Sequence, residues 1–252
     1  MTDVFEAQAV LFDLDGVLTD TAAVHRRAWS ALFTEFLPAI APEAAPYTDA
    51  DYFALVDGRA RAAGVRSVLA SRGVRVPDGE LNDPPGAQTV HGLGNRKNVR
   101  FTEIIAGEGV EVFEGSLRLV EALAAAGIAM AVVSSSRNAV LVLDTVGLRD
   151  RFAVVIDGVL AHDQHLASKP APDMFLTAAQ CLGVDPARTV VIEDAVSGVE
   201  AGRRGGFEVI GVDRGSGASA LWAAGADVVV SDLSELVEDR LGRRGSAVSE
   251  EI

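Results

Sequence analysis

Two carboxylates close an apolar run near the start of the chain, and a glycine follows them. Residues 10–20 read VLFDLDGVLTD, which places Asp13 and Asp15 two positions apart where a strand pattern ends. Side chains at positions i and i+2 of a strand point to the same side, so both carboxylates can address one ligand. Neighbouring carboxylates repel unless a proton or a cation lies between them, and Mg²⁺ prefers oxygen ligands. Gly16 permits a sharp turn. The run predicts a buried strand that ends at a magnesium site; the alternative is an ordinary acidic turn.

Three further polar groups lie at or near the end of an apolar run. They are Ser134 after residues 128–133, Lys169 in the loop sequence SKPAPD, and the pair Glu193 and Asp194 after residues 189–192. In a parallel sheet the carboxyl ends of the strands share one edge, and ligands bind in the crevice there. Each group alone has an ordinary explanation, such as a helix cap or a solvated loop charge. Their recurrence in this order predicts that they share one site.

Strand-like and helix-like patterns alternate only in the second half of the chain. From about residue 112 onward the alternation is typical of a doubly wound parallel sheet. We therefore expect an α/β core of residues 1–20 and 109–252, with a helical cap domain of residues 21–108 inserted after the first strand. The polar segment from Arg240 onward is expected to be irregular. Within the inserted domain, helices are expected at about residues 20–37, 52–73 and 96–106.

The composition is typical of a globular protein. The chain has 252 residues, of which 49% are hydrophobic and 23% charged, enough for a sizeable core. A formal net charge of −14 opposes binding to nucleic acid or anionic lipid. The longest apolar run, residues 122–133, is too short to span a membrane, and no signal peptide pattern is present. The single cysteine, Cys181, cannot form an internal disulfide and is expected to be buried. We expect a cytoplasmic protein without nucleic-acid or membrane partners, acting as a monomer.

The order of these motifs resembles the haloacid dehalogenase superfamily of phosphoryl-transfer enzymes. The resemblance covers about residues 9–213, and within the superfamily it points to the β-phosphoglucomutase-like subgroup. It implies a Rossmann-like catalytic core with an inserted cap. The matching segments are residues 13–21 (DLDGVLTDT) with His25 and Trp29, residues 134–138 (SSSRN), residues 168–173 (SKPAPD) and residues 192–198 (IEDAVSG).

The resemblance implies a role for each core residue. Asp13 is the nucleophile that forms an aspartyl-phosphate, and Asp15 is the general acid and base. Ser134 and Lys169 bind the transferring phosphoryl group. We expect the pKa of Asp15 to lie above that of Asp13, because Asp13 contacts the metal. The expected ligands of Mg²⁺ are Asp13, Asp15, Glu193 and Asp194.

The inserted helical segment carries its own candidates. Arg61, Lys97 and Asn98 resemble the cap residues that bind a second, non-transferring phosphate; the alternative is that they are solvated surface groups. His25 lies one helical turn before Trp29, and the resemblance implies that it helps to place Asp15. After Arg61 the chain reads AAG, where the subgroup often carries acidic and hydroxylated residues. This departure leaves the identity of the sugar open.

Two reactions follow from the resemblance. The first is the interconversion of β-glucose 1-phosphate and glucose 6-phosphate through phospho-Asp13, with cap closure excluding water so that the sugar accepts the phosphoryl group. The second uses the same core residues in a Mg²⁺-dependent phosphatase of a small sugar or polyol phosphate, with water as the acceptor. A non-catalytic module that binds phosphorylated sugars is a third alternative, but it would not need both Asp13 and Asp15.

Overall fold

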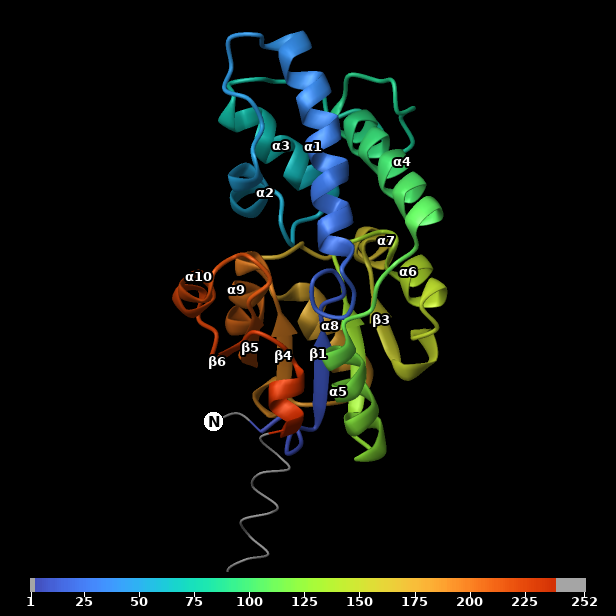
Figure 1. The fold of residues 1–252 in the computed structure, drawn as a ribbon, viewed down its shortest axis with the longest axis vertical. Helices are drawn as coiled ribbons and strands as arrows, with labels where there is room; N and C mark the ends of the chain where they lie inside the picture. The colour runs from blue at the N-terminus through green and yellow to red at the C-terminus, as the bar shows by residue number, and fades with distance from the viewer. Residues whose placement is uncertain (1–2, 239–252) are drawn as a thin grey trace, which may run out of the picture.

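Six short apolar segments form one parallel sheet in the computed structural model, which describes residues 3–238 (Figure 1). Across this range the strand order is β3-β2-β1-β4-β5-β6, so the chain winds outward from β1 in both directions. The predicted doubly wound α/β fold is confirmed. The strands are β1 (Ala9–Phe12), β2 (Ala129–Val133), β3 (Val154–Ile156), β4 (Thr189–Glu193), β5 (Glu208–Val212) and β6 (Val228–Val230).

Helices cover both faces of the sheet. They are α5 (Glu114–Ala125), α6 (Ala139–Thr145), α7 (Gly158–Asp163), α8 (Asp173–Leu182), α9 (Val196–Arg204) and α10 (Ala218–Ala224), with the short 3₁₀ helices η1 (Arg149–Arg151) and η2 (Pro186–Arg188). Val10 and Phe12 of β1 pack with α5 and α6, whereas Leu11 packs with α8, α9 and α10. Every residue of β1 is buried, as is usual for a central parallel strand. The sequence pattern did not predict α7 or α10, which have only six and seven residues.

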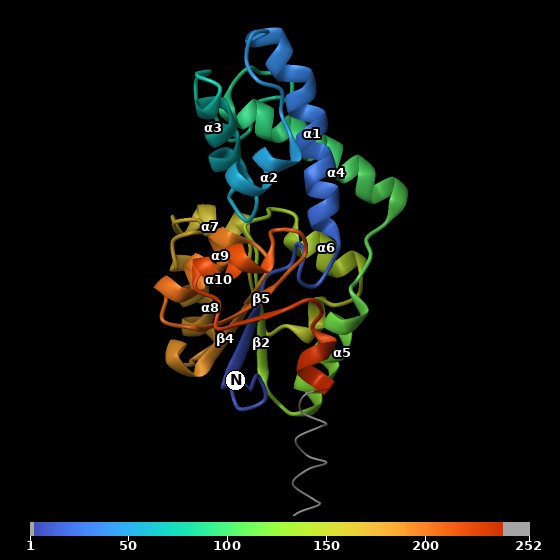
Figure 2. The same cartoon turned by 60° about the vertical axis from the view of Figure 1, so that its left-hand side comes forward.

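Four helices lie beyond the carboxyl ends of the strands, as a layer distinct from the sheet (Figures 1 and 2). They are α1 (Thr21–Ile40), α2 (Asp49–Leu55), α3 (Arg61–Ser71) and α4 (Val90–Glu108). Residues 21–108, all of which the structure describes, contain no strand. These helices enclose a hydrophobic cluster of their own, built from buried residues between Trp29 and Leu93. We propose on this basis that residues 21–108 form the cap domain and that residues 1–20 and 109–252 form the core.

The cap helices differ from the expected ones in two places. The helix expected at residues 52–73 is divided, because the chain leaves α2 at Val56 and turns at Gly58, which has a φ of +67°. The helix expected from residue 96 begins earlier, where the Thr89 hydroxyl accepts a hydrogen bond from the backbone N–H of Gly92. The first difference has a functional consequence, since the loop between α2 and α3 reaches toward the strand ends.

The two connections between the sheet and the cap run side by side. The backbone N–H of Asp20 donates to the carbonyl of Glu111 over 3.0 Å, and the N–H of Phe113 donates to the carbonyl of Leu18 over 3.1 Å. Thr19 and Val112 form an antiparallel bridge between them. The inserted segment therefore leaves and re-enters the core at one point.

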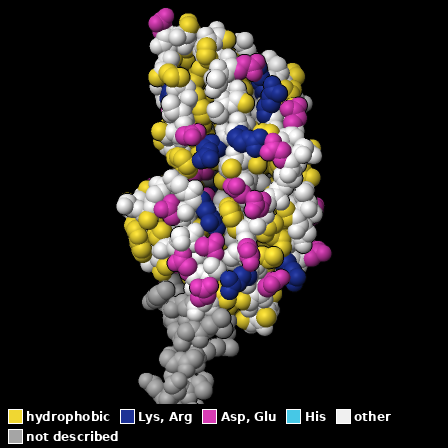
Figure 3. Space-filling view, viewed as in Figure 1, with side chains coloured by type: hydrophobic (Ala, Val, Ile, Leu, Met, Phe, Trp, Pro, Cys, Tyr) yellow, Lys and Arg dark blue, Asp and Glu magenta, His cyan; other side chains and the backbone are white. Residues whose placement is uncertain are grey.

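The surface of the described part of the chain corrects one expectation. Lys and Arg side chains are interspersed with Asp and Glu on the face in Figure 3, without a continuous basic area. Among residues 3–238 we find no helix with the length and hydrophobicity that crossing a bilayer requires. Cys181 is exposed and not buried as expected, because the buried face of α8 is formed by residues such as Phe175 and Ala178. Residues 239–252, including the segment expected to be irregular, lie outside the described residues.

Candidate active site

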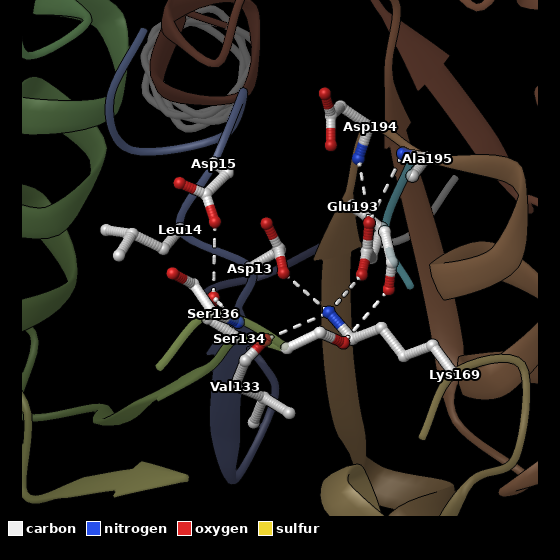
Figure 4. Close-up of polar contacts among 12 residues, drawn as sticks. Asp13, Leu14, Asp15, Val133, Ser134, Ser136, Lys169, Glu193, Asp194 and Ala195 are labelled. Atoms are coloured by element: carbon white, nitrogen blue, oxygen red, sulfur yellow. Dashed lines mark hydrogen bonds and ion pairs between the residues drawn. The ribbon is translucent and has the colours of Figure 1, made fainter. Parts of the chain in front are cut away.

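The carboxyl ends of three adjacent strands carry the core candidates (Figure 4). Asp13 directly follows β1, Ser134 follows β2, and Glu193 ends β4. Strands β2 and β4 pair with β1 on either side. Backbone hydrogen bonds continue the sheet through these positions, from the N–H of Asp13 to Ile192 and from the N–H of Ser134 to Ile156, each over 2.9 Å. The structure thus brings the predicted core residues together at one edge of the sheet.

Lys169 lies at the centre of this group. Its Nζ donates to Asp13 Oδ1 and Glu193 Oε1, both over 2.5 Å, and to the carbonyl of Val133 over 3.0 Å. One oxygen from each of Asp13, Glu193 and Asp194 lies within 4.8 Å of the other two, and all three residues are buried. Lys169 thus pairs with two of the three clustered buried carboxylates, Asp13 and Glu193.

The charges of this cluster are only partly compensated. Burial raises the pKa of Asp13 well above its usual value, because the charge of Lys169 does not fully offset desolvation and the nearby carboxylates. Burial, followed by the charge of Asp57, likewise raises the pKa of Asp194. Burial alone would lower the pKa of Lys169, but Asp13 and Glu193 outweigh it and raise that pKa. The cluster therefore favours an additional positive charge.

The residues present fit a hard divalent cation such as Mg²⁺. Carboxylate oxygens are its preferred protein ligands, and Asp13, Glu193 and Asp194 offer three of them within one small volume. Gly16, at a φ of +90°, lets the chain pass close to this point, since a Cβ there would lie 1.9 Å from Asp194 Oδ2. The Asp15 side chain, also expected as a ligand, is not part of this group of described residues.

Asp15 instead faces a separate set of donors. Its Oδ1 accepts a hydrogen bond from Thr21 over 2.5 Å and lies 3.3 Å from His25 Nε2, and its Oδ2 accepts from Ser134 over 3.3 Å. Burial alone would raise the pKa of Asp15, but the charge and hydrogen bond of His25, with that of Thr21, lower it to about 2. Without a cation at the acidic cluster, the pKa of Asp15 therefore lies below that of Asp13; the expected opposite order, which assumed a metal at Asp13, stays a prediction.

Asp13 and Asp15 line the same cavity, as expected, but strand alternation is not the reason. Strand β1 ends at Phe12, so the alternation of side chains along a strand does not extend to these two positions. Asp13 contacts Lys169 and Asp15 contacts Ser134 (Figure 4), and Asp15 also accepts a hydrogen bond from Thr21 of α1. The two carboxylates are thus prepared for different tasks.

His25 and Lys97 form a buried pair beside Asp15. Lys97 Nζ contacts His25 Nδ1 and lies 4.6 Å from the ring centre of Phe101 and 5.2 Å from that of Trp29. Burial, and then the charge of Arg61, lower the pKa of Lys97 well below its usual value. Burial and the charge of Lys97 lower the pKa of His25 in turn. The structure places His25 next to Asp15, as the resemblance implied, and Lys97 behind it.

A cavity of about 60 Å³ joins the core candidates to the cap. Arg61 reaches it from the start of α3, where its guanidinium donates to Asn95 and, over 2.7 Å, to Asn98 Oδ1. Asn98 also accepts a hydrogen bond from Asn138 of the core over 2.7 Å. Burial, followed by the charge of Arg137, lowers the pKa of Arg61 to about 10. Arg61 and Arg137 are therefore two positive groups, one from each domain, at the same cavity.

Sequence reasoning missed several residues that line this cavity. They are Tyr52, Asp57, Ser135, Ser136 and Arg137. The last three belong to the segment 134–138 that carried the resemblance, so their position beside Ser134 was an available signal. Asp57 had a weaker one, a glycine directly after it in a helical pattern.

Asp57 and Gly58 form a loop that the core holds in place. Ser197 Oγ donates to the carbonyl of Asp57 over 3.0 Å, and Ser135 Oγ donates to that of Gly58 over 2.9 Å. A Cβ on Gly58 would lie 2.4 Å from Ser197 Oγ, so only glycine permits this approach. Burial raises the pKa of Asp57 to about 7, although a hydrogen bond from Tyr52 opposes the rise.

Replacing Lys169 with methionine tests the electrostatic role of this lysine. We expect Lys169→Met to lower the free energy of unfolding by about 3–5 kcal/mol without divalent cations, because it leaves buried carboxylates without their partner. Mg²⁺ should recover part of this loss. Urea unfolding with and without Mg²⁺ measures both effects. Arg27→Met, at the exposed ion pair with Glu108, is the control and should leave the midpoint nearly unchanged. A loss below about 1 kcal/mol for Lys169→Met would contradict the argument.

Comparisons with known proteins show the family of the chain and the relatives it resembles. The model of the haloacid dehalogenase-like hydrolase family matches residues 7–206. The chain is 50% identical over 242 residues to a β-phosphoglucomutase of Mycobacterium tuberculosis, covering 92% of each protein. It is 33% identical over 235 residues to the β-phosphoglucomutase of Bacillus subtilis, covering 93% of each. Its fold resembles a solved β-phosphoglucomutase of Clostridium difficile with a TM-score of 0.75 and 24% identity, over 96% of this chain and 99% of that one.

Proposed function

The chain belongs to the haloacid dehalogenase-like hydrolase family and is an enzyme, and from this premise we propose that it is a phosphomutase that interconverts β-glucose 1-phosphate and glucose 6-phosphate. The resemblance read from the sequence motifs is confirmed by the family match. We infer the identity of the sugar from the similarity of most of the chain to proteins named β-phosphoglucomutase. The phosphatase alternative is supported by the family description.

The observation that carries the mutase proposal is the charge of the cavity. Three arginines line it, and among the described residues none of the three forms a salt bridge with a carboxylate; they are Arg59, Arg61 and Arg137. Lys169 supplies positive charge at the strand ends, where it pairs with Asp13 and Glu193. A mutase handles a sugar that carries two phosphates in its intermediate, so it needs positive charge at both ends of its site. A phosphatase of a simple ester needs it at one end only.

In the proposed mechanism Asp13 is the nucleophile. Its carboxylate attacks a phosphorus of the sugar bisphosphate and forms an aspartyl-phosphate as the bond between that phosphorus and the sugar oxygen breaks, while Lys169 and Ser134 bind the oxygens of the transferring group. Asp13, Glu193 and Asp194 would hold Mg²⁺, which neutralises charge on the phosphoryl group when bound. Asp13 is positioned for this by its backbone hydrogen bond to β4 and its ion pair with Lys169.

Asp15 carries the proton. With its pKa lowered to about 2 it is ionised, so it first takes the proton from the sugar hydroxyl that attacks phospho-Asp13. It then holds that proton on its carboxyl group, ready for the leaving oxygen when the sugar bisphosphate has turned around. Thr21, His25 and Ser134 hold Asp15 at the cavity throughout. The cap covers the site and keeps water away from phospho-Asp13.

The test of the function is ³¹P NMR of the protein with Mg²⁺, β-glucose 1-phosphate and a trace of the bisphosphate. Accumulation of glucose 6-phosphate supports the mutase. In the Arg61→Ala variant we expect bisphosphate affinity to fall about ten- to hundredfold, since charge-assisted contacts contribute roughly 1.5–3 kcal/mol each. A simple phosphate ester should lose less. The ratio of inorganic phosphate to isomerised sugar should rise, because a loosely held cap admits water.

Arg66→Ala is the matched control for this experiment. Arg66 lies on the same helix, α3, but pairs with Asp78 at the surface and does not line the cavity. Its removal should change neither the ratio nor the affinity. If the wild type already releases mostly inorganic phosphate and Arg61→Ala changes nothing, the phosphatase takes the place of the mutase. The magnesium ion, the cytoplasmic location and the monomeric state stay predictions.

A further inference from the structure

Asp57 is a carboxylate of the cavity that the proposed mechanism does not use. The other carboxylates that line the cavity, Asp13, Asp15 and Asp194, belong to the core and are occupied by Lys169, by the donors around Asp15 or by the acidic cluster. Asp57 comes from the cap. Its carboxyl group lies near Tyr52 and the backbone of Gly58, and Asp57 itself lines the cavity.

The loop that carries Asp57 is fixed and not a freely moving surface turn. Hydroxyl groups from two different core segments bind its backbone, at Asp57 itself and at Gly58. The close approach of Gly58 to Ser197 leaves no room for the loop to shift inward. A carboxylate on such a support has a defined position relative to the strand ends, which is what selection of a substrate group requires.

The charge of Asp57 decides which part of a substrate can lie against it. Its proximity to the acidic cluster follows from its effect on Asp194, where it is the largest of the charges that raise the pKa. A phosphate group would be repelled there, whereas Arg61 and Arg137 attract one elsewhere in the cavity. Above its pKa of about 7 the Asp57 carboxyl group is ionised, and a neutral hydroxyl group can then donate to it and form a charge-assisted hydrogen bond.

We propose that Asp57 is a specificity-determining residue that accepts a hydrogen bond from a ring hydroxyl of the sugar, so that the cap selects a neutral, hydroxyl-bearing body between the two phosphate positions. This inference rests on the proposed action on sugar phosphates and does not depend on whether the acceptor is sugar or water. In this proposal, the loop between α2 and α3, which the sequence pattern did not predict, carries a residue that binds the substrate.

The test is a panel of substrates measured with Asp57 variants. The panel contains β-glucose 1-phosphate and its 2-deoxy, 3-deoxy and 4-deoxy analogues, and the readout is kcat/KM for total consumption, as isomerised sugar plus inorganic phosphate. Asp57→Ala should lose about ten- to hundredfold on the parent sugar. On the one analogue that lacks the hydroxyl bonded to Asp57, the kcat/KM of Asp57→Ala should be no more than about threefold below that of the wild type. Asp57→Asn, which keeps an oxygen acceptor, should lie between wild type and alanine.

Two further arms separate this role from others. Asp78→Asn removes the same charge from an exposed part of the cap, where Asp78 pairs with Arg66, and should change none of the four substrates. An equal loss on all four substrates for Asp57→Ala would overturn the proposal, since a structural or metal-related role acts on every substrate alike. An unchanged kcat/KM on the parent sugar would overturn it as well. Total consumption counts both products, isomerised sugar and inorganic phosphate. If the wild type releases only inorganic phosphate, the mutase proposal fails. The comparison of Asp57 variants still tests the role of Asp57 in that case.

Discussion

An Asp13→Asn variant is expected to form no detectable phosphoenzyme and to lose turnover by a factor on the order of 10⁴–10⁶, the range found when a catalytic nucleophile is removed. An amide is a poor nucleophile toward phosphorus, and the substitution keeps the size of the side chain. The fold should survive, because the backbone N–H of Asp13 still bonds β4. Acid-quenched protein incubated with phosphorus-labelled sugar phosphate, assayed for a hydroxylamine-sensitive acyl phosphate, measures the intermediate directly.

The control for this experiment is Asp20→Asn. Asp20 lies in the same turn after β1 but is exposed, and its backbone, not its side chain, makes the contact to Glu111. That variant should form phosphoenzyme as the wild type does. Retention of a hydroxylamine-sensitive acyl phosphate in Asp13→Asn would show that another carboxylate is the nucleophile, and Asp13 would lose its assigned role.

An Asp15→Asn variant should lose turnover by about 10²–10⁴-fold while keeping its affinity for divalent cations. The first expectation follows from the usual contribution of general acid–base catalysis. The second follows from the structure, in which the carboxylate of Asp15 faces Thr21 and His25 and not the group of Asp13, Glu193 and Asp194. Steady-state kinetics and calorimetric titration with Mg²⁺ give the two quantities separately.

The two measurements on Asp15→Asn have different contrary outcomes. Turnover close to that of the wild type would exclude the acid–base assignment. A large loss of Mg²⁺ affinity would place the Asp15 side chain among the metal ligands, as the sequence reasoning first proposed. Asp194→Asn is the reference for that comparison, because its carboxylate belongs to the acidic group and its loss should weaken metal binding directly.

The core was predictable because its signals are local. An apolar run that is buried on both faces identifies a parallel strand, and the polar residue that follows it lies at the edge where ligands bind. Asp13, Ser134 and Glu193 each occupy that position on their strands. The contacts of the Asp15 side chain were harder to predict. Their prediction assumed strand geometry, and the chain turns at Gly16 instead.

The cap was less predictable because its important contacts are not local. The division between α2 and α3 depends on hydroxyl groups of Ser135 and Ser197, far along the chain, which bind the loop backbone. Lys97 reads as a surface residue because buried lysines are rare, yet the faces of two aromatic rings shelter it. Helical periodicity contains no information on either arrangement.

The paired connections at residues 18–20 and 111–113 bear on how such a protein can diversify. Because the inserted segment leaves and re-enters at one hydrogen-bonded point, its ends are already together in the folded core. The entropy of closing a loop grows only with the logarithm of its length, by roughly 0.6 kcal/mol for each doubling. Added or deleted helices in the cap therefore cost the stability of the core little. Over evolutionary time, such an insertion can change in size and sequence to suit new substrates while the phosphoryl-transfer residues beneath it stay where they are.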